Sequence, residues 1–162
     1  MDEKYIKNDI MRYKNNKTSS LLAILSILLN VFYFVSIYKT NAQDYYYNMK
    51  IGFSIIYNLL FLLIAFLSSE GVKNYKVSFA IILIVIGAMQ FVRIAGIPVD
   101  AHFRAMVTID GVAVHAMSTA QFVKSIIYIC GSGAFAIASG VTCILKSMAL
   151  NKHIASLDEA VS

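Results

Sequence analysis

The sequence predicts an all-α integral membrane protein, a bundle of four transmembrane helices with a short extracytoplasmic β-hairpin between helices 3 and 4. Four apolar stretches, at about 20–38, 51–69, 77–96 and 122–145, are each long enough to cross a hydrocarbon core about 30 Å thick at 1.5 Å rise per residue. None of the nine Asp and Glu residues falls within them. The chain is also 59% hydrophobic and only 14% charged, which is unusual for a soluble domain.

The four spans divide the chain into a membrane domain, residues 20–145, and two cytoplasmic tails, residues 1–19 and 146–162. In the first tail, Tyr5, Ile6, Ile10 and Tyr13 recur at helical spacing among lysines. This pattern is typical of a basic amphipathic helix on an anionic membrane surface, although a solvated, partly disordered tail explains it equally well. The second tail is polar from Asn151 onward, and we expect it to be frayed.

The basic residues predict the orientation. With the N-terminus in the cytoplasm, nine Lys and Arg residues lie inside: Lys4, Lys7, Arg12, Lys14, Lys17, Lys73, Lys76, Lys146 and Lys152. Five lie outside: Lys39, Lys50, Arg93, Arg104 and Lys124. Since cytoplasmic loops carry the excess of positive charge, we expect a multi-pass protein of the plasma (inner) membrane with both termini cytoplasmic.

Polar residues inside the first three spans form a layer in their outer halves. The layer consists of Asn30, Tyr33, Tyr57, Asn58, Gln90 and Arg93. Counting from the outer span ends places the two asparagines about 11–12 Å deep and Arg93 about 5 Å deep. The simpler interpretation is hydrogen bonding between helices, which fixes their register. The functional interpretation is a polar pocket that opens outward, with Arg93 and Lys124 near its mouth.

The fourth span carries a stripe of small residues, Ser125, Ser132, Ala136, Ser139 and Gly140. Small residues one turn apart let two helix backbones approach closely, which drives helix association in lipid. The stripe therefore predicts close packing, either inside the bundle or against another chain.

The outer loop, residues 97–121, contains Asp110 and Gly111 between two β-prone runs, 106–109 and 112–115. Asp-Gly in this setting is a strong signal for a two-residue hairpin turn, and we expect the exposed strand edges to recruit a partner. The loop also holds possible metal ligands and charged residues, Asp100, His102, Arg104, Asp110 and His115. Their spacing matches no known metal site, so we expect no metal.

Other function classes find no support in the sequence. No catalytic or cofactor motif is present, and the net charge of +5 lies beside membrane spans, so we expect neither an enzyme, nor a cofactor, nor nucleic-acid binding. We expect an accessory or assembly subunit that binds membrane lipids and forms a homo- or hetero-oligomer with another membrane protein. The alternative is a small oligomeric transporter or channel with an outward-facing polar pocket.

Overall fold

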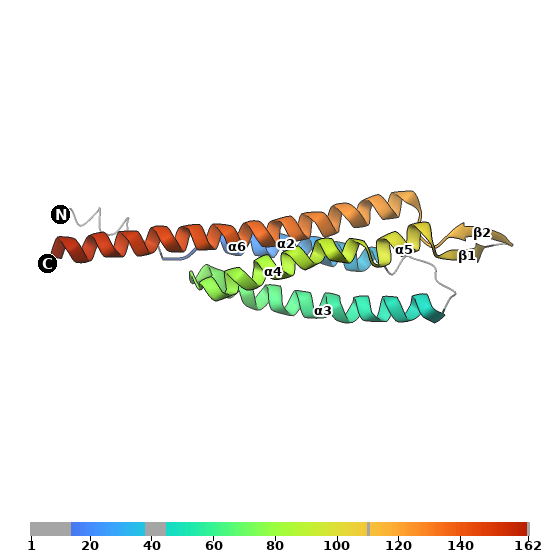
Figure 1. The fold of residues 1–162 in the computed structure, drawn as a ribbon, viewed down its shortest axis with the longest axis horizontal. Helices are drawn as coiled ribbons and strands as arrows, with labels where there is room; N and C mark the ends of the chain where they lie inside the picture. The colour runs from blue at the N-terminus through green and yellow to red at the C-terminus, as the bar shows by residue number, and fades with distance from the viewer. Residues whose placement is uncertain (1–13, 38–44, 110, 162) are drawn as a thin grey trace.

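The computed structural model describes residues 14–37, 45–109 and 111–161. The elements follow in the order α2 (Lys17–Ile37), α3 (Tyr45–Lys73), α4 (Val77–Ile94), α5 (Ile97–Phe103), β1 (Met106–Ile109), β2 (Val112–His115) and α6 (Thr119–Val161). Four of the helices, α2, α3, α4 (with α5) and α6, are long and apolar enough to cross a membrane. Figure 1 shows them as an elongated bundle, with the hairpin projecting from one end and α6 running past the other helices at the opposite end.

Helices α4 and α6 touch through their backbones. A Cβ atom on Gly87 would lie 2.9 Å from the carbonyl oxygen of Gly133, and one on Gly133 would lie 2.8 Å from the carbonyl oxygen of Gly87. Farther along, a Cβ atom on Gly140 would lie 2.5 Å from the carbonyl oxygen of Ala80. Only glycine permits so close an approach, and the two helices gain dispersion contacts along their length from it.

Helices α2 and α6 are joined by serine side chains that donate to backbone carbonyl groups across the interface. Ser26 Oγ donates to the carbonyl oxygen of Ser132 at 2.7 Å, and Ser132 Oγ donates to that of Ser26 at 2.9 Å. Ser139 Oγ donates to the carbonyl oxygen of Ser19 at 2.6 Å. All five residues of the small stripe are buried, and the serines and Gly140 face the chain's own helices. The stripe is thus occupied within the bundle, which leaves no room on it for another chain.

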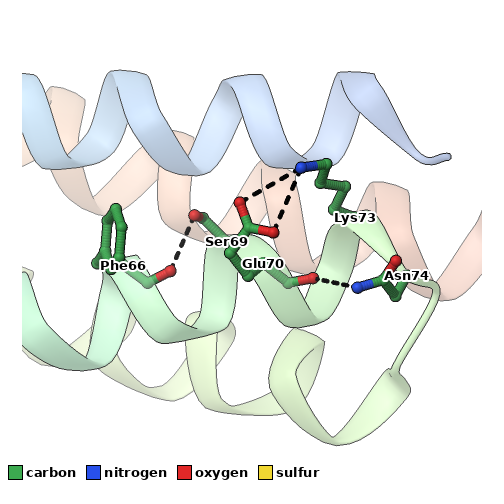
Figure 2. Close-up of polar contacts among 5 residues, drawn as sticks. All are labelled: Phe66, Ser69, Glu70, Lys73 and Asn74. Carbon is green, nitrogen blue, oxygen red and sulfur yellow. Dashed lines mark hydrogen bonds and ion pairs between the residues drawn. The ribbon is translucent and has the colours of Figure 1, made fainter.

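The turn between α3 and α4 satisfies its own polar groups. Figure 2 shows Ser69 Oγ donating to the carbonyl oxygen of Phe66, Asn74 Nδ2 donating to that of Glu70, and an ion pair between Lys73 and Glu70. The backbone N–H of Asn16 donates to the carbonyl oxygen of Lys73 at 2.8 Å, so the start of α2 is held beside the end of α3. The bonds to Glu70 and Lys73 supply donors to backbone carbonyl groups that the end of a helix leaves without an intrahelical partner.

The hairpin agrees with the sequence prediction. Strands β1 and β2 pair antiparallel, with Met106 opposite His115 and Ile109 opposite Val112. Gly111 has φ +80°, the left-handed conformation that the turn requires. The backbone N–H of Met117 donates to the carbonyl oxygen of Ala101 at 3.0 Å, which attaches the segment after the hairpin to α5.

The helices differ from the predicted spans at several ends. Helix α6 continues to Val161, so the expectation of a frayed segment from Asn151 was wrong; a long apolar helix nucleates the turns that follow it. Residues 97–103 form α5 rather than an irregular loop. Pro98 lies in the first turn of α5, where its missing N–H removes no helical hydrogen bond. The amphipathic segment of residues 5–13 lies outside the described residues.

Candidate binding site around Arg93

Arg93, in the last turn of α4, is held by neutral acceptors on α3. Its Nη1 donates to Asn58 Oδ1 at 2.9 Å, and its Nη2 donates to Ser54 Oγ at 2.8 Å. A longer contact of 3.4 Å joins Nη1 to Gln90 Oε1, one turn earlier on α4. Ser54 and Asn58 are four residues apart and therefore project from the same face of α3.

Two tyrosine rings also contact the guanidinium of Arg93. Its Cζ atom lies 4.4 Å from the ring centroid of Tyr33 on α2 and 4.7 Å from that of Tyr57 on α3. Cation–π attraction is strongest when the cation is shielded from water, and Tyr33 is fully buried. Three helices thus fix the plane and position of a single positive charge.

Five of the six residues in the predicted polar layer meet at this point, namely Tyr33, Tyr57, Asn58, Gln90 and Arg93. The sixth, Asn30, is buried on α2 one turn before Tyr33. Three buried amide atoms in the layer, Asn30 Oδ1, Asn58 Nδ2 and Gln90 Nε2, have no hydrogen-bond partner among the described residues. The layer therefore keeps polar capacity beyond the bonds that hold its helices together.

No carboxylate pairs with Arg93 within residues 14–37, 45–109 and 111–161. An isolated charge at a low-dielectric position is costly, and proteins usually neutralise it with an opposite charge. Neutral acceptors and aromatic faces reduce that cost but leave the net charge in place. Among the described residues, the charge of the guanidinium is therefore not neutralised by a paired carboxylate.

A cleft of about 540 Å³ adjoins the guanidinium, between α3 on one side and α4 and α5 on the other. Figure 1 shows α3 diverging from α4 toward the end of the bundle that carries the hairpin. The residues that line the cleft are Tyr33, Lys50, Phe53, Ser54, Ile56, Tyr57, Leu60, Val92, Arg93, Gly96, Ile97 and Asp100. Lys124, expected near the mouth of such a pocket, is not among them.

The end of the cleft near the hairpin is closed by an ion pair between α3 and α5. Lys50 Nζ donates to Asp100 Oδ2, and Arg104 Nη1 donates to Asp100 Oδ1 at 3.2 Å. Asp100 is only 8% exposed, so its carboxylate is largely removed from water. The sequence prediction places Asp100 and Arg104 in the outer loop and does not connect them to Lys50. The available signal was that Lys50, Ser54 and Asn58 recur every four residues on one face of α3.

Of the remaining outer-loop candidates, His102 and His115 lie among the described residues. The ring of His102 stacks on that of Phe122 at 4.6 Å, and its Nδ1 lies 3.1 Å from the carbonyl oxygen of Met117. The ring of His115 is 6.1 Å from that of His102, and Asp110 lies outside the described residues. Throughout the part of the chain that the structure describes, no three His, Cys, Asp or Glu residues are grouped so that they could hold a metal ion.

Comparisons with known proteins add no further constraint, because the chain matches no family model, no curated protein and no solved structure.

Proposed function

We propose that the chain is a multi-pass protein of the plasma (inner) membrane that binds an anionic ligand at Arg93, without catalysis, as a small oligomeric transporter or channel would. The observation that carries the proposal is the guanidinium of Arg93, held by neutral groups beside a cleft of about 540 Å³. Side chains that carry charge within membrane spans commonly mark the path of a substrate or ion. An anion supplies the counter-charge that the described residues do not.

The proposed orientation places both termini in the cytoplasm and the hairpin outside. Supporting it, Lys146 Nζ donates to Thr18 Oγ1 at 2.8 Å, so the start of α2 lies beside α6 at Lys146, at the end of the bundle toward which α6 continues. The hairpin lies at the opposite end (Figure 1). The excess of Lys and Arg at the end shared by α2 and α6 then faces the cytoplasm.

Accessibility labelling tests this orientation. In a background with Cys130 and Cys143 replaced by Ala, single cysteines are introduced by Lys152→Cys and Asp110→Cys. We expect a membrane-impermeant maleimide to label position 110 in intact cells and position 152 only after the cells are opened. Labelling at position 152 in intact cells would reverse the proposed topology.

Native mass spectrometry of gently extracted protein tests the anion site. We expect the wild-type protein to retain an anionic small molecule and Arg93→Gln to lose it. Lys124→Gln is the matched control, because Lys124 is an exposed cation on α6 that does not line the cleft. Equal retention by all three proteins would contradict a binding site at Arg93.

An accessory or assembly subunit is the second candidate function. It is favoured by the hairpin, in which all four residues of β2 are exposed and which projects from the end of the bundle (Figure 1). An unpaired strand edge can add a strand from another protein. Docking would use the hairpin or outward helix faces, since the small stripe of α6 is already occupied. In the same mass spectra, a retained protein subunit with no anionic ligand would favour this function.

A further inference from the structure

We propose that the cleft between α3 and α4 binds one anionic glycerophospholipid from the surrounding bilayer, with its phosphate at Arg93 and part of an acyl chain against α3. This inference rests on the proposed function, because it names the class of ligand that the anion site would take. It depends on the direction in which the cleft opens, on the order of its polar and apolar walls, and on its charge.

The cleft opens sideways, toward the side of the bundle that a bilayer would cover. Four apolar residues of its wall are highly exposed: Phe53 at 68%, Ile56 at 57%, Leu60 at 53% and Val92 at 75%. Exposed apolar residues at this depth face lipid in a membrane protein, so a lipid can enter without crossing water. A water-soluble anion would leave these walls unused.

Along the cleft, the wall residues change from charged to apolar in the order in which a lipid molecule changes from its headgroup to its acyl chains. Along α3, Lys50 lies nearest the hairpin, Ser54 and Tyr57 lie beside the guanidinium, and Leu60 lies farthest in. Ten residues of helix separate Lys50 from Leu60, a distance of about 15 Å. A headgroup, a phosphate and the first part of an acyl chain follow one another over a similar length. The volume of about 540 Å³ is typical of sites for organic ligands and far exceeds the needs of a phosphate alone.

The charge of the cleft favours an anionic lipid over a zwitterionic one. Two cations, Lys50 and Arg93, and one carboxylate, Asp100, line it, and Asp100 also pairs with Arg104. The described residues that line the cleft thus carry a net positive charge, and a phosphodiester group with no compensating amine neutralises it. Guanidinium groups bind phosphate through charge-assisted hydrogen bonds in a fixed fork geometry. The contacts of Arg93 to the described residues use Nη1 and Nη2, and none uses Nε.

The test uses the full-length protein in nanodiscs of dioleoyl phosphatidylcholine that contain dioleoyl phosphatidylglycerol. Native mass spectrometry counts the lipid molecules that remain bound to the protein after the protein is released from the nanodiscs. The soluble probe sn-glycerol 3-phosphate, measured in the same way, reports anion binding without acyl chains. The variants are Arg93→Gln, Arg93→Lys and Leu60→Trp, which fills the apolar part of the cleft. Leu63→Trp is the matched control, since Leu63 is equally exposed on α3, at 56%, but does not line the cleft.

We expect the wild-type protein to retain one phosphatidylglycerol in preference to phosphatidylcholine. Arg93→Gln and Leu60→Trp should each weaken this retention about tenfold. The first removes the contact to the phosphate, and the second fills the space for the acyl chain. Arg93→Lys should be intermediate, because it keeps the positive charge but loses the Nε–H donor and the planar shape of the guanidinium. Leu63→Trp should behave as the wild type. Binding of glycerol 3-phosphate should be weak, and it should depend on Arg93 but not on Leu60.

The outcomes separate the two proposals. Equal retention of both lipids by the wild type, or unchanged retention in Leu60→Trp, overturns the lipid inference. If glycerol 3-phosphate binding still depends on Arg93 in that case, the anion site stands with a soluble ligand. If neither probe depends on Arg93, both proposals fail. Since Leu60 is exposed and the cleft beside it is open, its variant keeps the test decisive even if Arg93→Gln does not fold.

Discussion

The two sides of α4 pack in opposite ways. Toward α6, backbone lies on backbone, and Gly87 and Gly133 exclude even a methyl group. Toward α3, at the hairpin end, the helices diverge and leave a cleft beside Arg93. The ion pair between Lys50 and Asp100 closes only the end of this cleft near the hairpin. The first interface is stabilised by close contact of small residues, which tolerates no added volume. The second is stabilised by a few polar bonds and can accept a ligand. One helix therefore serves both as a rigid support and as the wall of a binding site.

The largest effect should come from added volume on the tight side. Gly140→Leu places a side chain where a Cβ atom alone would lie 2.5 Å from the carbonyl oxygen of Ala80. We expect the free energy of unfolding to fall by about 3 kcal/mol. Val141→Leu is the matched control. Val141 is the next residue along α6 and its side chain is 42% exposed, so the substitution should leave the free energy of unfolding nearly unchanged. Denaturation in mixed micelles measures both variants, and equal midpoints would show that α4 and α6 are not in close contact.

A smaller effect should follow from loss of the ion pair that closes the cleft. Asp100→Asn removes a carboxylate that pairs with the half-buried Lys50 and with Arg104. Because Lys50 retains some contact with water, we expect a loss of about 1–2 kcal/mol, below that for a fully buried pair. Hydrogen exchange should become faster in α5 and remain unchanged in the middle of α6.

The matched control for Asp100→Asn is Glu70→Gln at the opposite end of α3. The carboxylate of Glu70 pairs with Lys73 in the open, with the two side chains 58% and 39% exposed (Figure 2). Its loss should cost less than about 0.5 kcal/mol. If the two variants lose equal stability, the pair at the cleft is no more than a surface contact.

The smallest effect should come from added volume on the open side. Leu60→Trp enlarges an exposed side chain beside the cleft, and we expect the free energy of unfolding to change by less than about 0.5 kcal/mol. Measured under the conditions used for Gly140→Leu, this variant compares the effect of added volume at the cleft with its effect at the interface of α4 and α6. A loss as large as that of Gly140→Leu would mean that the cleft is closed in solution.

Local patterns in the sequence predicted the elements whose causes are local. The four apolar helices follow from run length, and the hairpin follows from Asp110 and Gly111 between β-prone residues. The polar layer was predicted from residue type and depth, since few polar residues occur inside the spans.

The cleft and its closing ion pair could not be predicted in this way. Lys50 and Asp100 are fifty positions apart. They meet because α3 extends about two and a half turns beyond Ser54, its contact with Arg93, and because the chain breaks at Gly96 before α5. Neither the divergence of α3 nor the direction of α5 has a signature in the local sequence. For the same reason, the sequence left open whether the small stripe of α6 would face its own bundle or another chain.

Helix α6 has a mechanical consequence. At 43 residues it is about 65 Å long, roughly twice the thickness of a hydrocarbon core. Figure 1 shows its final part projecting beyond the other helices, while its middle is pressed against α2 and α4. A continuous helix held at its middle acts as a lever, so a slight tilt inside the bundle becomes a larger displacement at the free end. A spin label at Ser156 would therefore report, from outside the bundle, a change in packing around Gly133.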